Sequence, residues 1–257
     1  MRAIWSGAIG FGLVNIPVKM YSAVQDSSLD LDMLDKKDHS NIRFQRVNEK
    51  TGKEVAWENI VRGYKYNGDY VVLTDEDFKK ASPEKSKLIE IAEFVKQSEI
   101  DTVYYETPYY LEPEKTGVKA YALLRDALEK SGKVGLGTYV MRTKETIGII
   151  KPMDNILVLN KMRFPEEIRD HKDLKVPEEK SKPNELKMAL ALIDQLSGPF
   201  DLKKYKDTYS DQLMKVIEAK AKGQKIAAPT MKVVHSRSQD LMDQLKASLN
   251  TSKRKAS

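Results

Sequence analysis

The chain has 257 residues, contains no cysteine, and carries 44 Lys and Arg against 38 Asp and Glu, a formal net charge of +6 at pH 7. This length can bury one large core or two modest ones, and the lack of cysteine excludes disulfides, thiolate metal sites and cysteine nucleophiles. The longest apolar runs, 147–150 and 156–159, are far shorter than the roughly 20 residues that span a bilayer, so we expect a cytoplasmic protein without a membrane segment.

The first predicted element is a β-hairpin. Val14, Ile16, Val18 and Met20 alternate with other residues, which is the pattern of a strand with one buried face. Residues 10–12 should form the turn that follows a first strand over 3–9. Pro17 has no N–H to donate, so the strand should lie at an edge or a bulge there.

Strands continue to dominate as far as residue 164. They are predicted at 29–34, 42–47, 64–73 with an Asn-Gly turn, 88–95 and 103–105, and at least three more follow residue 132. Thr74 should cap a short helix. A longer amphipathic helix over 118–130 should end at Gly132 and pack on a sheet. The predicted fold class is therefore mainly β with some α.

A charged segment with two prolines then marks a boundary. Beyond it, two short amphipathic helices are predicted, which end at Gly198 and Gly223. We expect a core over 1–170, a linker over 171–183, a small helical C-terminal region over 184–223, and a flexible basic tail over 224–257.

The tail contains an amphipathic segment over 237–249. Its apolar stripe is either one face of a frayed helix or a peptide that docks into a groove of a partner, and an unsupported stripe favours docking. The predicted docking residues are Leu241, Met242, Leu245 and Leu249.

No motif predicts catalysis. The stretch "GKVGLGT" at 132–138 lacks the ending of a phosphate-binding loop and the helix that would follow it. His39, His171 and His235 are scattered without the spacing of a triad or a metal pair. We therefore expect no enzyme, no metal and no cofactor, with a metal-dependent nuclease as the alternative.

Charge is distributed unevenly along the chain. From residue 171 onward there are 18 Lys and Arg against 11 Asp and Glu, whereas the first 170 residues hold 26 against 27. Within the latter, residues 36–65 hold eight basic and four acidic side chains. This segment is either an anion-binding ribbon or a solvated hairpin, and charge alone favours neither. Trp57, Tyr64 and Tyr66 fit core packing as well as base stacking.

Five stretches together resemble the bacterial Ku family. They are "RAIWSGAIGFGLVNIPVKMYSA", "IVRGYKYNGDYVVLTDEDF", "YYETPYYLEPEK", "KAYALLRDALEKSGKVGLGTYVMRTKE" and "DLMDQLKASL". The resemblance runs in order over the first 165 residues and returns near the tail. It implies a Ku-type β-barrel core with an extended bridge, or arm, at about 29–66, of which 29–62 would cross the DNA.

The resemblance also implies a function. Ku proteins pair into a ring that threads onto the ends of double-stranded DNA and recruits an ATP-dependent DNA ligase with polymerase activity in nonhomologous end joining. We therefore expect a homodimer that binds DNA ends at the nucleoid of a bacterial cytoplasm, with a general DNA-coating protein as the alternative. The predicted DNA-binding residues are Lys19, Lys36, Lys37, Arg43, Arg46, Lys53, Arg62, Lys65, Arg142 and Lys144.

This chain departs from the family in two places. Many Ku proteins carry cysteines near the turn that reads "VNEKTGKE" here, and without them no metal clip is available at that turn. The tail is also shorter and less rich in lysine than the long tails of some members, which weakens the expectation that it contacts DNA.

Overall fold

The computed structural model describes residues 1–81, 87–176, 178–224, 242, 244–245 and 248. The chain forms two compact units. The first consists of Met1–Asp26 and Asp30–Asp170, and the second of Ser27–Leu29 and His171–Ser257.

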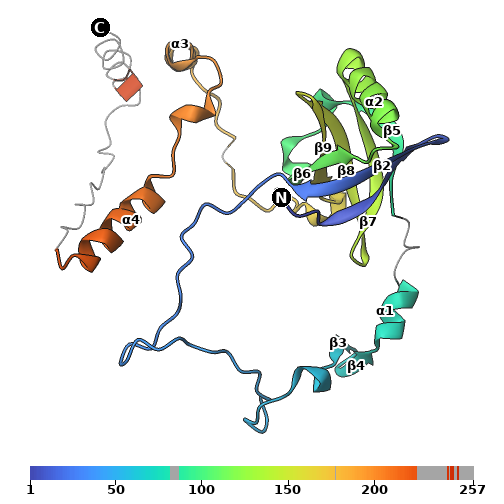
Figure 1. The fold of residues 1–257 in the computed structure, drawn as a ribbon. Helices are drawn as coiled ribbons and strands as arrows, with labels where there is room; N and C mark the ends of the chain where they lie inside the picture. The colour runs from blue at the N-terminus through green and yellow to red at the C-terminus, as the bar shows by residue number, and fades with distance from the viewer. Residues whose placement is uncertain (82–86, 177, 225–241, 243, 246–247, 249–257) are drawn as a thin grey trace. The chain divides into compact units, whose positions relative to one another are not determined.

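The first unit is built around a closed seven-stranded β-barrel (Figure 1). The order around the barrel is β1, β2, β6, β9, β8, β7, β5, and β5 returns to β1 as the parallel pair of an otherwise antiparallel barrel. The strands are β1 (Trp5–Phe11), β2 (Val14–Ser22), β5 (Leu88–Lys96), β6 (Tyr105–Pro113), β7 (Lys133–Met141), β8 (Lys144–Met153) and β9 (Ile156–Met162). With four α-helices in the described residues, the predicted fold class of mainly β with some α is confirmed.

The opening hairpin forms as predicted. Ile16, Val18 and Met20 are fully buried, whereas Val14, next to the turn, is 39% exposed. At Pro17 the strand has only β1 beside it, because the pairing with β6 begins at Val18. The missing N–H therefore leaves no ladder bond unmade.

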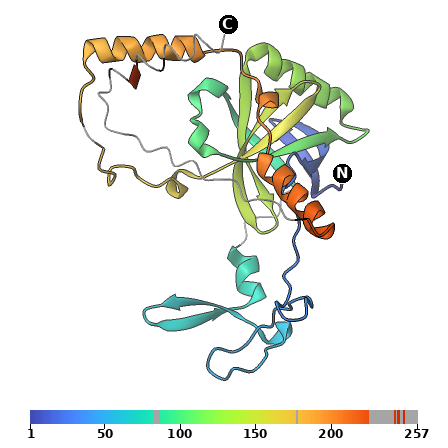
Figure 2. The ribbon, with the colours of Figure 1, turned by 90° about the vertical axis from the view of Figure 1, so that its left-hand side faces the viewer.

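The helix α2 (Val118–Ser131) packs against the barrel, as predicted (Figure 2). Tyr121 and Leu124 on its inner face join the barrel core. The Tyr121 hydroxyl donates to the carbonyl of Leu111 and accepts from the N–H of Leu157, both at 2.6 Å, so this buried polar group is satisfied. Gly132 ends the helix in the left-handed conformation.

The prediction of a strand at 103–105 is wrong in position. A 3₁₀ turn, η3 (Thr102–Tyr104), occupies most of that stretch, and the strand β6 starts at Tyr105. Pro108 concealed this strand from pattern reasoning. The ladder between β6 and β9 tolerates the proline because its register shifts between Tyr105 and Pro108.

The chain between β2 and β5 departs most from the predictions. Strands at 29–34 and 42–47 are absent, and only the isolated bridges Leu34↔Asn41 and Val47↔Glu54 form there. A strand needs a neighbour for its N–H and C=O groups, and this stretch has none. The predicted hairpin at 64–73 does form, as β3 (Arg62–Tyr66) and β4 (Asp69–Leu73).

Short helical elements complete the first unit. The hairpin leads into α1 (Asp75–Ala81), before which Thr74 lies as the predicted cap. The 3₁₀ turns are η1 (Trp57–Asn59), η2 (Gln97–Glu99) and η4 (Pro165–Glu167).

The second unit contains α3 (Pro183–Leu196), η5 (Leu202–Lys204) and α4 (Thr208–Ala221). Both predicted helices are confirmed. Asp207 caps α4 by accepting from the N–H groups of Tyr209 and Ser210. The predicted end at Gly198 is wrong, because Ser197 is the C-cap of α3 in an extended conformation. Within the described part of these helices, only Ala219 is buried, so they lack a core of their own.

Candidate nucleic-acid interface

The first feature of the site is an arm, defined here as residues 30–81. It contains the bridge predicted from the sequence, the β3–β4 hairpin and α1 (Figures 1 and 2). None of its residues is buried. Seven of the ten predicted DNA-binding residues lie on it, all of them exposed: Lys36, Lys37, Arg43, Arg46, Lys53, Arg62 and Lys65.

Local hydrogen bonds shape the middle of the arm into a small loop. Val47 and Glu54 form a bridge, and the side-chain carbonyl of Asn48 accepts from the N–H groups of Lys50 and Thr51, each at 3.0 Å. Gly52 supplies the positive φ of +67° that the turn requires. This loop therefore holds its shape through backbone contacts rather than through a metal clip.

Arg46 stacks on an aromatic ring next to this loop. Its Cζ atom lies 4.6 Å from the centroid of the Trp57 ring. A stacked guanidinium keeps its charge and its outward donors, so it stays able to bind a phosphate while its direction is fixed.

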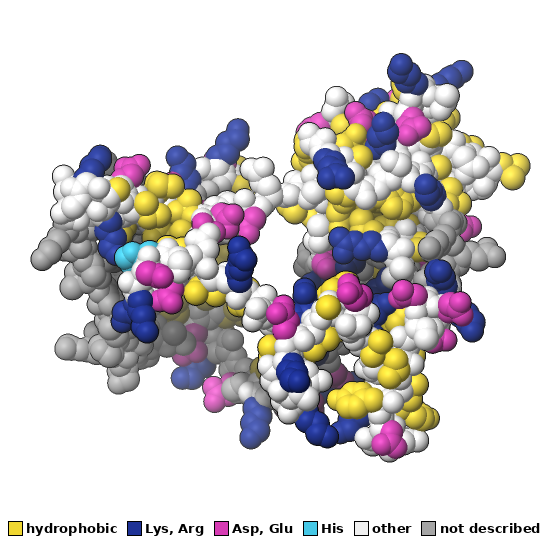
Figure 3. Space-filling model, turned by 60° about the horizontal axis from the view of Figure 1, so that its bottom comes forward, with side chains coloured by type: hydrophobic (Ala, Val, Ile, Leu, Met, Phe, Trp, Pro, Cys, Tyr) yellow, Lys and Arg dark blue, Asp and Glu magenta, His cyan; other side chains and the backbone are white. Residues whose placement is uncertain are grey.

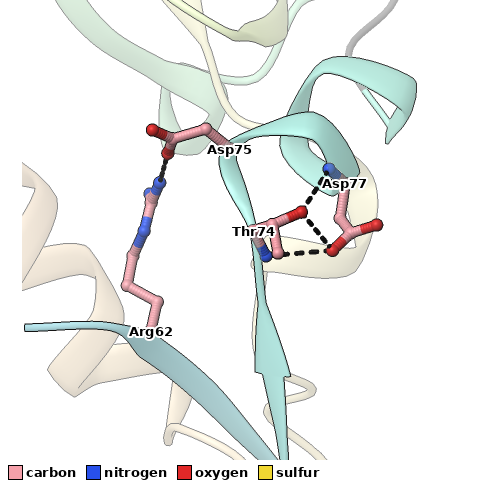
Figure 4. A network of polar contacts seen from close by, with 4 residues as sticks. All are labelled: Arg62, Thr74, Asp75 and Asp77. Carbon is pink, nitrogen blue, oxygen red and sulfur yellow. Dashed lines mark hydrogen bonds and ion pairs between the residues drawn. The ribbon is translucent and has the colours of Figure 1, made fainter.

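Arg62 is held in a second stack, between the hairpin and α1. Its Cζ atom lies 3.6 Å from the centroid of Phe78, and its Nη2 atom lies 3.3 Å from Oδ1 of Asp75 (Figure 4). A two-stranded hairpin is only marginally stable alone. We infer that Arg62 ties the hairpin to the helix.

A capping box holds the first turn of α1 next to Arg62. The N–H and hydroxyl of Thr74 donate to Oδ2 of Asp77 at 2.9 and 2.7 Å, and the N–H of Asp77 donates to the Thr74 hydroxyl at 3.3 Å (Figure 4). The hydroxyl and then the backbone N–H of Thr74 hold the pKa of Asp77 below its ordinary value. The carboxylate is therefore charged at neutral pH, near the positive end of the helix.

The other cations of the arm point in several directions. Lys36 and Lys37 lie in a turn, and Arg43 lies in an extended segment. Arg62 and Lys65 are three residues apart on β3 and so point to opposite faces of the hairpin. The structure thus places the seven cations on one segment without gathering them on one flat face.

The three remaining predicted DNA-binding residues lie on the barrel and are exposed. Lys19 pairs across the ladder with Glu112 on β6 and shares a shallow pocket with Glu114 and Lys115, so its surroundings are mixed in charge. Arg142, with a φ of +62°, and Lys144 flank the turn between β7 and β8. These two cations are therefore brought together, and Lys19 lies on a different strand pair.

The arm also exposes aromatic and aliphatic side chains. Trp57 is 70% exposed and Tyr64 is 67% exposed, and Tyr66 and Phe44 are similar. The core-packing interpretation of Trp57, Tyr64 and Tyr66 is therefore wrong within this chain. In the view of Figure 3, hydrophobic, basic and acidic side chains lie interspersed on the surface. Such a surface offers flat rings as well as charge to a ligand.

Sequence reasoning missed the residues that orient the arginines. Phe78 and Asp75 had no assigned role, and Trp57 had two open ones. Each of these residues is distant in sequence from the arginine it contacts, and no residue pattern marks such a pair.

Of the predicted docking residues, Met242 and Leu245 are helical and half-buried. Leu241 and Leu249 lie outside the described residues. Within the described part of the chain, no cluster of three His, Asp or Glu residues is placed to hold a metal ion. No described helix is long and apolar enough to cross a membrane.

Comparison with known proteins connects this geometry to a family. Residues 10–189 match the family model described as the Ku70/Ku80 beta-barrel domain. The chain is 41% identical over 248 residues to a Pseudomonas aeruginosa protein named non-homologous end joining protein Ku, which covers 94% of this chain and 85% of the relative. Relatives of the same name are 37% identical in Bacillus subtilis, over 99% of this chain and 83% of the relative, and 40% identical in Archaeoglobus fulgidus, over 98% and 100%. An exposed arm inserted into a closed barrel, together with these matches, shows that the chain belongs to the Ku family.

Proposed function

We propose that this chain is a DNA-end clamp of nonhomologous end joining. Two copies close into a ring around double-stranded DNA in the cytoplasm, at the nucleoid, and recruit an ATP-dependent DNA ligase with polymerase activity. The names of the relatives, non-homologous end joining protein Ku, support the pathway. The clamp performs no chemistry of its own.

The arm is the observation that carries the proposal. It leaves the barrel after β2, returns at β5, buries none of its described side chains, and holds seven exposed cations. A segment that contributes no core would be a loss to a solitary protein, because ordering each residue costs about 1–2 kcal/mol of backbone entropy. A ligand and a second copy that both contact the arm would offset this cost.

The proposed ring explains why ends are required without any reading of bases. Lys and Arg contacts to phosphates give affinity that is independent of sequence. Closure around the duplex adds a topological condition, because a ring that does not open can load only where a strand terminates. End selectivity then arises from shape and affinity from charge.

The direct experiment compares linear duplex with a closed circle of equal length and sequence at moderate salt. We expect retention of the linear duplex and loss of the circle, with a mass in the same samples that corresponds to two copies. Linearising the circle with one cut should restore retention, which is the matched control. Equal retention of both forms would instead support a general coating protein. Cleavage of either form after addition of Mg²⁺ would support the nuclease alternative.

A further inference from the structure

The helix α3 has an apolar face that is partly covered within the second unit. Its half-buried residues are Glu185, Met188, Ala189 and Leu192, which recur at spacings of three and four and so form one stripe. Residues beside that stripe are more open, and Leu190 and Ile193 are 51% and 59% exposed. The partial burial is therefore confined to one side of α3.

The tail segment around Leu245 contacts this stripe. Leu245 helps to line a surface pocket of about 350 Å³ together with Glu185, Leu186 and Ala189 of α3 and with residues 179–181. Met242, Gln244 and Leu245 are themselves half-buried. Burial is thus reciprocal, on the tail segment and on the stripe of α3.

The chemistry of the two surfaces explains why they associate. A helix of 14 residues is marginal in water unless an amphipathic face is covered. The tail segment likewise presents apolar side chains without a core of its own. Apposing them removes apolar surface from water on both sides, at about 25 cal/mol for each Å².

We propose that the tail segment containing Met242 and Leu245 docks on the Glu185–Leu192 stripe of α3 in the same chain and thereby withholds its docking residues from the ligase. The ligase must displace the segment from α3 before it can bind it, so recruitment has a built-in restraint. The second part of this inference rests on the function proposed above, whereas the contact itself does not.

The absence of cysteine from the chain makes a clean test possible. We would introduce Ala189→Cys with Leu245→Cys into the full chain, and bridge the thiols with a short bis-methanethiosulfonate that reductant removes. The matched control replaces Ala191 instead of Ala189. Ala191 is two residues further along, about 200° around α3, and exposed.

We expect the Ala189 pair to cross-link within one chain roughly tenfold faster than the Ala191 pair, the ratio that about 1.4 kcal/mol of preference gives. Equal rates, or covalent dimers in place of intramolecular products, would overturn the contact. With the cross-link in place, stimulation of the ligase should fall to background, and reductant should restore it to the level of the same variant before cross-linking. Stimulation that the cross-link leaves unchanged would overturn the restraint. If the unmodified chain does not stimulate the ligase, ligase recruitment fails as a function, while the cross-linking rates still decide the contact.

Discussion

The arginines of the arm differ in what their guanidinium groups contact. Arg46 stacks on Trp57, and Arg62 stacks on Phe78 and pairs with Asp75. Arg43 makes no ion pair or ring stack with any described residue, so its charge is fully available to a phosphate. Exposed cation–π pairs are worth about 0.5–1 kcal/mol each. Removing Arg46 or Arg62 would therefore alter the arm as well as its charge, whereas removing Arg43 alters charge alone.

We predict that Arg43→Ala weakens binding of linear duplex equally for all sequences. It should also reduce the slope of log affinity against log salt by about 0.9, the value for one phosphate contact. Fluorescence anisotropy titrations at several salt concentrations measure both quantities. The matched variant Arg46→Ala should additionally change the fluorescence of Trp57. An unchanged slope for Arg43→Ala would remove this residue from the phosphate contacts.

At the scale of elements, the contact between β5 and β7 depends on glycine. The ladder shifts register between Ile91 and Glu93, and Gly137 lies opposite this bulge. A Cβ atom on Gly137 would lie 1.8 Å from the backbone carbonyl oxygen of Glu90. The bulge and the glycine therefore fit each other, and they account for part of a glycine-rich stretch that resembles a phosphate loop only in composition.

We predict that Gly137→Ala destabilises the barrel by about 1–3 kcal/mol, because the two strands must move apart. Denaturant unfolding followed by a probe of the barrel measures the change. Gly63→Ala is the control, since a Cβ atom there would meet its nearest neighbours at an ordinary 3.5 Å. Equal stability of the Gly137→Ala variant and the unmodified protein would show that the barrel yields at this point at no cost.

At the scale of the whole molecule, a charge-driven clamp must depend on salt. The net charge of +6 is modest, and the first 170 residues are close to neutral, so affinity must come from local contacts rather than from a general positive field. If about six phosphates are neutralised, log affinity should fall against log salt with a slope near −5. Titration of linear duplex between low and moderate salt measures this slope. A slope near zero would exclude phosphate contacts as the source of affinity.

The sequence by itself determined those elements whose signals lie within a few residues. Alternation at Ile16, Val18 and Met20 identified the buried face of β2, and Gly132 marked the end of α2. Both signals are local, because the period of a strand or a helix and the conformation of a cap depend on near neighbours. The charge of the arm could be read from the sequence for the same reason.

Only the tertiary structure decided which extended segments became strands and which cations were held. Residues 42–47 have the composition of a strand but no neighbouring strand, whereas β6 forms in spite of Pro108 because β2 and β9 lie on either side of it. The stacks of Arg46 and Arg62 likewise depend on rings brought close by folding. The physical reason is that a ladder bond or a stack needs a partner from a distant part of the chain, and the fold alone supplies that partner.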